Sequence, residues 1–131
     1  MTRFVVDAGA VIHLVGEGIA VRHSHKLLAP TLIRSQTLSI LHEAVQRGEI
    51  PAAVARDQLA RIGRLPIRLL GDAVLRRRAW DLAEQLGWAS TYDAEYIALT
   101  QLQADAFITL NAKLARSVKG IVVAASIDAL F

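Results

Sequence analysis

The sequence contains no cysteine. This absence excludes disulfide bonds, catalysis by a thiolate and metal sites built from thiolates. A metal ion in this protein would therefore be bound by carboxylate, amide, water or histidine ligands. Such a ligand set favours hard ions such as Mg²⁺ or Mn²⁺.

Long hydrophobic runs are also missing, since no apolar segment approaches the about 20 residues that span a bilayer. The N-terminus leads directly into an apolar strand pattern, without the charged, apolar and cleavage segments of a signal peptide. We therefore expect a cytoplasmic protein that does not associate with membranes. Apolar residues make up 53% of the 131 residues and charged residues 21%, a composition typical of globular proteins. This length predicts one domain, residues 1–131.

The 12 acidic residues are fewer than the 15 lysines and arginines, which gives a net charge of +3 and a pI near 9.8. The basic residues are clustered along the chain and favour a polyanionic partner. A solvent-exposed helix face is the simpler interpretation of such clusters. They comprise Arg56, Arg61, Arg64 and Arg68 in one stretch, and Arg76, Arg77 and Arg78 in another.

Strand-like and helical patterns alternate along the chain, which predicts an α/β fold with a mostly parallel sheet and helices on both faces. The expected strands are 3–7, 27–29, 66–70, 106–109 and 121–124. The expected helices are 10–15, 31–47, 51–62, 72–86, 90–102 and 111–117, with Gly63 ending the third and Gly87 the fourth.

Polar side chains fall where this architecture places the carboxyl ends of the strands. Asp7 follows the first strand, Asn111 follows the strand at 106–109, and Asp93 lies where a helix begins. Gln36 lies one turn inside the long second helix. Each has a structural alternative: Asp7 and Asn111 can cap helices, Asp93 can form a capping box with Ser90, and Gln36 can satisfy a backbone group.

Four segments resemble the PIN-domain family, specifically the VapC-type toxins of bacterial toxin–antitoxin pairs. They are FVVDAGAVIHL, LLAPTLIRSQTLSIL, STYDAEYIALTQLQADAFITLNAKLA and the closing IVV. The resemblance covers essentially the whole chain. It implies a single PIN-like domain that cleaves RNA as a Mg²⁺- or Mn²⁺-dependent endoribonuclease. It also implies a homodimer and a cognate VapB-like antitoxin that silences the enzyme.

The family's site contains four acidic residues, and two of them are amides in this sequence. The first acid matches Asp7, and the acid of the Tyr-Asp-Ala motif matches Asp93. The second acid falls on Gln36 and the fourth on Asn111, while Ala8 replaces a small hydroxyl residue that often follows the first Asp. The resemblance therefore implies that Asp7, Asp93, Gln36 and Asn111 form the catalytic site, with Asp7 and Asp93 as metal ligands.

The loss of two charges predicts a weakened metal site. Amide oxygens can coordinate a hard cation, but they carry no charge and cannot act as a general base. We expect one weakly bound ion whose coordination is completed by RNA phosphate. Glu43, two helical turns beyond Gln36, is a weak substitute ligand, and Glu95 points away from Asp93.

Three functional hypotheses follow. The first is a VapC-like endoribonuclease with a weakened site, whose arginine-rich segments contact RNA phosphates. The alternative is a catalytically inactive PIN-fold module that binds an antitoxin or RNA. A nucleotide-binding or phosphoacceptor domain fits less well, because no glycine-rich phosphate loop follows the first strand. Dimer contacts are expected within residues 31–62.

Overall fold

The computed structural model describes residues 1–131, which fold around a five-stranded sheet. The strand order is β3-β2-β1-β4-β5, and every neighbouring pair is parallel. Parallel sheets are buried on both faces, which explains the continuous apolar runs in β1 and β4. The predicted α/β class is confirmed. The strands are β1 (Thr2–Val6), β2 (His25–Pro30), β3 (Ile67–Leu70), β4 (Ala106–Ile108) and β5 (Ala124–Ala125).

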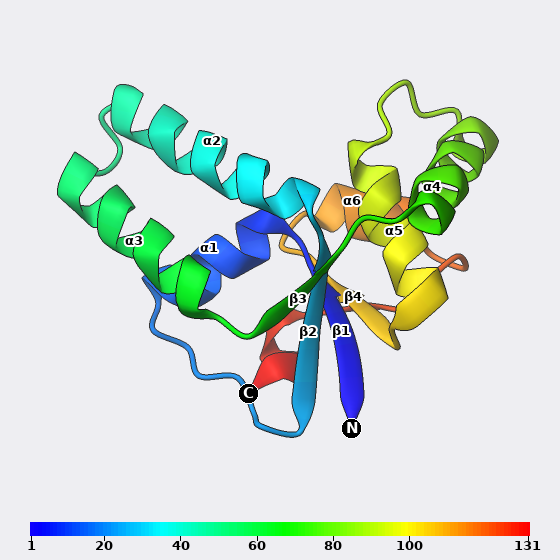
Figure 1. The fold of residues 1–131 in the computed structure, drawn as a ribbon, viewed down its shortest axis with the longest axis horizontal. Coiled ribbons are helices and arrows are strands. Elements are labelled where there is room, and N and C mark those ends of the chain that lie inside the picture. Colours follow the sequence, from blue (N-terminus) through cyan, green and yellow to red (C-terminus); the bar gives the residue numbers. More distant parts are fainter.

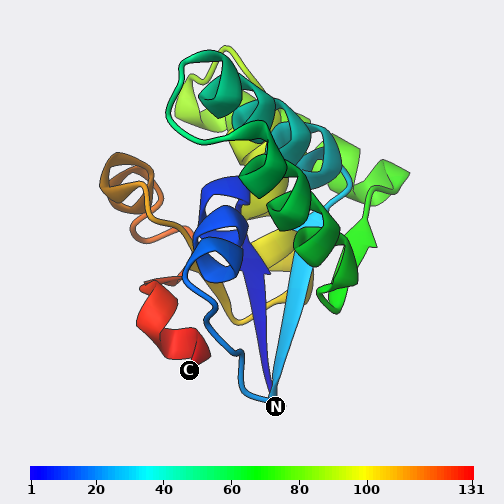
Figure 2. The same cartoon turned by 90° about the vertical axis from the view of Figure 1, so that its left-hand side faces the viewer.

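Helices cover the sheet in two layers (Figure 1). α1, α2 and α3 lie on one side of the sheet, and α4 and α5 lie on the other. Figure 2 shows α2 and α3 side by side as a hairpin beside α1. The helices are α1 (Ala8–Gly16), α2 (Leu32–Gln46), α3 (Ala52–Arg64), α4 (Ala73–Leu86), α5 (Tyr92–Gln103) and α6 (Ala112–Ser117), followed by a 3₁₀ helix at Ile127–Leu130.

Local signals set the bounds of α4 as predicted. The Asp72 carboxylate caps its first turn by accepting a hydrogen bond of 2.8 Å from the Leu75 N–H. Gly87 ends the helix with φ at 70°, in the left-handed region that glycine adopts without a steric penalty.

Several expected boundaries are wrong. β2 begins at His25 rather than residue 27, and α5 begins at Tyr92 rather than residue 90. α1 begins at Ala8 rather than residue 10, because Asp7 itself caps the helix. α3 passes through Gly63 to Arg64, where the glycine keeps ordinary helical dihedrals. The last strand is Ala124–Ala125 instead of 121–124, because the N–H groups of Ile121 and Val122 bond the Val118 carbonyl oxygen in a turn.

The core lies on both faces of the sheet: α1 contributes buried Ala8, Ala10, Val11 and Leu14 on one face, and α5 contributes buried Ala94 and Tyr96–Thr100 on the other. α5 packs against β1, β2 and β4, so its first turn lies above the carboxyl ends of the central strands. No helix of the structure has the length and apolar character to cross a membrane.

Candidate active site

Asp7 lies at the carboxyl end of β1 and has both carboxylate oxygens engaged. Oδ1 accepts a hydrogen bond of 2.9 Å from the Ala10 N–H, which caps α1. Oδ2 accepts a bond of 2.5 Å from the Thr109 hydroxyl. The structure therefore shows the cap that the sequence offered as an alternative. It also shows a second partner that fixes the carboxylate at the edge of the sheet.

Thr109 connects Asp7 to Asn111. The Thr109 hydroxyl donates to Asp7 and accepts a bond of 3.0 Å from the Asn111 N–H. The side chain of Asn111 caps α6, since its Oδ1 accepts a bond of 3.0 Å from the Leu114 N–H. Thr109 was missing from the predicted site, although its place directly after a buried strand is the same signal that selected Asn111.

Asp93 occupies the first turn of α5 and accepts no hydrogen bond from the protein. The alternative of a capping box with Ser90 is not found: Thr91 is the N-cap, and the Ser90 hydroxyl accepts a bond of 3.3 Å from the Tyr92 N–H. The carboxylate of Asp93 is thus available for an external ligand.

Gln36 is bonded to α5 across the edge of the sheet. The hydroxyl of Tyr96 donates a hydrogen bond of 2.6 Å to Gln36 Oε1, so Gln36 binds a side chain rather than the backbone group expected. Burial raises the pKa of Tyr96, and the carboxylates of Asp7, Glu95 and Asp93 raise it further, which keeps the hydroxyl protonated as a donor. Tyr96 was also missed, although it follows Asp93 by three residues and so shares its helix face.

The surroundings of Asp7 and Asp93 disfavour the ionised form of both side chains. Burial raises the pKa of Asp7, repulsion from Asp93 adds to this, and the bonds from Thr109 and Ala10 oppose it. Partial burial of its carboxyl group raises the pKa of Asp93, although the residue as a whole is exposed. No group of three or more histidine, aspartate or glutamate side chains in the structure could hold a metal ion. The site thus consists of two carboxylates, two amides and two hydroxyls.

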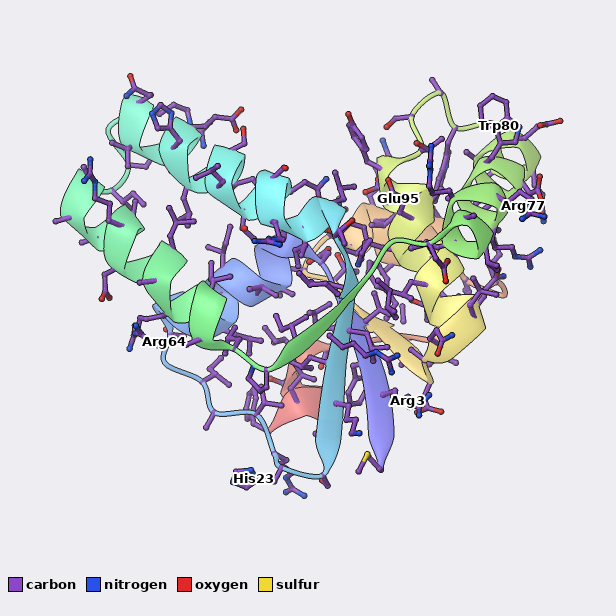
Figure 3. The ribbon with its side chains drawn as sticks, viewed as in Figure 1. Arg3, His23, Arg64, Arg77, Trp80 and Glu95 are labelled. Carbon is purple, nitrogen blue, oxygen red and sulfur yellow. The ribbon has the colours of Figure 1, made fainter.

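The other acids considered from the sequence lie outside this group. Glu43 is exposed on α2 and bonds no site residue. Glu95 lies on α5 facing α4, as Figure 3 shows. It lines a cleft of about 420 Å³ together with Arg76, Arg77 and the exposed Trp80. Thr91, the N-cap residue of α5, also lines this cleft.

The chain matches no family model. It is 30% identical over 113 residues to the VapC ribonuclease Mb0985 of Mycobacterium bovis and to ribonuclease VapC9 of Mycobacterium tuberculosis. The match spans 84% of this chain and 87% of each relative. The chain belongs to the VapC ribonuclease family. This membership confirms the resemblance stated from the sequence.

Solved structures agree with a VapC-type PIN fold. PAE2754 from Pyrobaculum aerophilum superimposes with a TM-score of 0.78 and 21% identity, covering 98% of this VapC-family chain and 92% of the other. VapBC2 from Rickettsia felis, bound to a DNA fragment from its promoter, gives a TM-score of 0.61 and 12% identity, with 95% and 98% of the two chains covered. At these identities the structures support the fold alone.

Replacing Thr109 with valine tests the hydroxyl that joins Asp7 to Asn111 in this VapC-family site. Valine keeps the shape but leaves the Asn111 N–H and one Asp7 oxygen without their partner. The free energy of unfolding should therefore fall by about 1–3 kcal/mol, measured by urea denaturation. The pKa of Asp7 should rise, because the hydroxyl bond lowers it in the parent protein. Unchanged stability would contradict this role of Thr109.

Proposed function

We propose that this chain is a toxin ribonuclease that hydrolyses RNA phosphodiester bonds with the help of one Mg²⁺ or Mn²⁺ ion bound by Asp7 and Asp93. The observation that supports it most is the meeting of these two carboxylates at the carboxyl edge of the sheet, in a chain 30% identical to VapC ribonucleases. The experiment that tests it is cleavage of RNA with Mn²⁺, with and without a chelator.

The donor set fits a single hard cation. Asp93 has no protein partner, and each oxygen of Asp7 accepts one hydrogen bond, which leaves a further lone pair for a ligand bond. The amide oxygens of Gln36 and Asn111 are each engaged by one donor and can contribute only their remaining lone pairs. Mg²⁺ sites commonly use one or two carboxylates and retain several waters. A second ion would need more negative charge than two aspartates provide.

The roles of the residues follow from their contacts. A bound cation supplies charge neutralisation at the phosphoryl oxygens and acidifies a water molecule. The Ala10 N–H and the Thr109 hydroxyl hold the Asp7 carboxylate in one orientation. The Tyr96 hydroxyl holds the Gln36 side chain of α2 through its hydrogen bond. Arg76 and Arg77 in the neighbouring cleft neutralise RNA phosphates.

We also propose a VapB-like antitoxin as partner and a homodimer. A toxin–antitoxin complex from Klebsiella pneumoniae (TM-score 0.54, 15% identity, 88% and 92% of the two chains covered) and VapBC2 share this fold. An antitoxin segment with basic residues would complement Asp7 and Asp93. Exposed Leu38, Ile40 and Val54 on α2 and α3 support dimer contacts within residues 31–62.

The alternative is a PIN-fold module that binds RNA or an antitoxin without cleavage. It is favoured by the bonds that engage both amide oxygens within the protein. RNA binding without any cleavage at high protein and Mn²⁺ concentrations would support this alternative over the enzyme.

Metal binding should weaken on mild acidification. The ion requires ionised carboxylates, and the pKa values of Asp7 and Asp93 are raised. The Mn²⁺ affinity, measured by calorimetry across a pH series, should therefore fall at a pH above the about 3.9 of an ordinary aspartate. Without metal, stability should decrease as pH rises through the same range, because the folded state binds more protons than the unfolded state. A midpoint at or below the ordinary value would contradict the role of these carboxylates as ligands.

A further inference from the structure

A second cleft lies at the amino ends of the central strands. Its volume is about 540 Å³. Its lining includes Arg3, near the start of β1, so it lies at the opposite end of this strand from Asp7. Figure 1 shows the N-terminus at this end of the sheet. Figure 3 shows Arg3 and His23 at this end of the molecule and Glu95 at the other. We call it the amino-end cleft, and its polar lining consists of Arg3, Arg22, His23, His25, Lys26 and Arg68.

No acidic residue lines the amino-end cleft. The protein contains two ion pairs, Arg47–Glu49 and Arg61–Asp57, and neither involves a residue of the cleft. Asp105 approaches Arg3, but it accepts its bond from the backbone N–H of Arg3. The arginines and the lysine therefore form a concentrated positive charge that no carboxylate of the protein neutralises at contact distance.

The backbone holds these cations at defined positions. Arg3 on β1 and Lys26 on β2 are register partners, and Arg68 on β3 pairs with the neighbouring Leu28. The spacing of adjacent strands is about 4.8 Å, so the three side chains project from one rigid frame. Arg22 lies in the loop before β2, and two hydrogen bonds of 3.0 Å hold its backbone. Its N–H donates to the Leu130 carbonyl, and its carbonyl accepts from the His25 N–H.

The remaining lining of the cleft is largely apolar and includes Ile19, Val21 and Leu65. His25 packs edge-on against Phe4 with ring centroids 5.1 Å apart. Its Nδ1 is the one buried side-chain nitrogen or oxygen in the protein without a hydrogen-bond partner. A cleft whose lining combines apolar side chains with cations suits a ligand that carries both flat bases and phosphates.

We propose that the amino-end cleft binds a second segment of the RNA strand, with phosphates on Arg3, Arg22, Lys26 and Arg68 and a base against the apolar wall. This inference rests on RNA being the polyanion on which the protein acts. Arginine binds phosphate oxygens through two parallel N–H donors, which makes it suited to this contact. An antitoxin segment basic enough for the Asp7 site would be repelled here. Because the cleft and Asp7 lie at opposite ends of β1, an RNA strand that occupies both extends along the sheet from one end to the other.

Binding of single-stranded oligouridylate of about 20 nucleotides, measured by fluorescence anisotropy in EDTA, tests the proposal without cleavage. The double variant Arg22→Ala, Arg68→Ala should bind about tenfold more weakly. The slope of log affinity against log salt should fall by about 1.4, at about 0.7 for each lost contact to a single strand. Lys119→Ala removes an exposed cation that follows α6 and lies outside the cleft; it is the control and should leave both quantities unchanged.

Equal affinities of the double variant and the control would overturn the proposal. Polyglutamate that displaces the RNA from the parent protein, but not from the double variant, would also overturn it in favour of an acidic protein partner. Cleavage of an oligouridylate of about 4 nucleotides, too short to reach the cleft, should be the same in the double variant and the parent. If neither the parent nor the double variant cleaves RNA but their RNA affinities still differ, the ribonuclease function is contradicted. The second RNA-binding site is then still supported.

Discussion

Replacing Asp7 with asparagine is expected to reduce Mn²⁺-dependent RNA cleavage by at least about 100-fold, since even residues that only support metal ligands cost up to this amount. Asparagine retains an oxygen that can cap α1 through the Ala10 N–H. It removes one of the two negative charges on which the proposed metal site depends. Addition of EDTA to the parent protein should abolish cleavage as well.

Asp72→Asn is the matched control for this experiment. Asp72 caps α4 in the same way as Asp7 caps α1, through a bond of 2.8 Å to the Leu75 N–H. It follows β3, an edge strand that lies two positions away from β1 in the sheet. The control should keep its activity, and circular dichroism should show both variants folded. Activity of Asp7→Asn close to that of the parent would place the metal site elsewhere.

The double replacement Gln36→Glu, Asn111→Asp is expected to tighten Mn²⁺ binding by roughly 10- to 100-fold. At an effective dielectric constant of 20, two unit charges 4 Å apart attract by about 4 kcal/mol, and desolvation offsets part of this gain. Both changes preserve the local bonds, because Glu can accept from the Tyr96 hydroxyl and Asp can accept from the Leu114 N–H. The measurement is calorimetric titration with Mn²⁺ alongside the RNA cleavage rate, which should increase.

The same variant should be less stable than the parent without metal, because four carboxylates then repel one another. Saturating Mn²⁺ should reverse this difference in Tm, since a ligand stabilises the state that binds it. Gln85→Glu on the exposed face of α4 adds a charge away from the site and serves as control. Metal affinity that is unchanged in the double variant would contradict the argument that missing charge limits this site.

Features set by neighbouring residues were predictable from the sequence. Asp72 and Gly87 mark the two ends of α4 through contacts with residues a few positions away. The local sequence alone therefore locates this helix. Asp7 and Asn111 were selected because parallel strands bring their carboxyl ends to one edge. Both positions require only the order of the elements.

Features set by distant residues were not predictable. The bond from Thr109 to Asp7 joins residues 102 positions apart, and that from Tyr96 to Gln36 joins residues 60 apart. The places of Thr109 after β4 and of Tyr96 on the Asp93 face of α5 indicate that both lie near the site, but no local pattern identifies the residues to which they bond. The β-branched stretch 121–123 was misassigned for a different reason: a local turn, in which the N–H groups of Ile121 and Val122 bond the Val118 carbonyl oxygen, overrides its strand propensity.

The hydrogen bond between Tyr96 and Gln36 joins α5 to α2, and so connects the two helical layers across the edge of the sheet. A glutamate at position 36 would divide its oxygens between this tyrosine and a cation, whereas the glutamine is committed to the tyrosine in the absence of metal. The relative position of these two helices is therefore set before any ligand arrives. Less ordering entropy is lost when a ligand binds, and this preorganisation offsets part of the affinity that the missing charge removes.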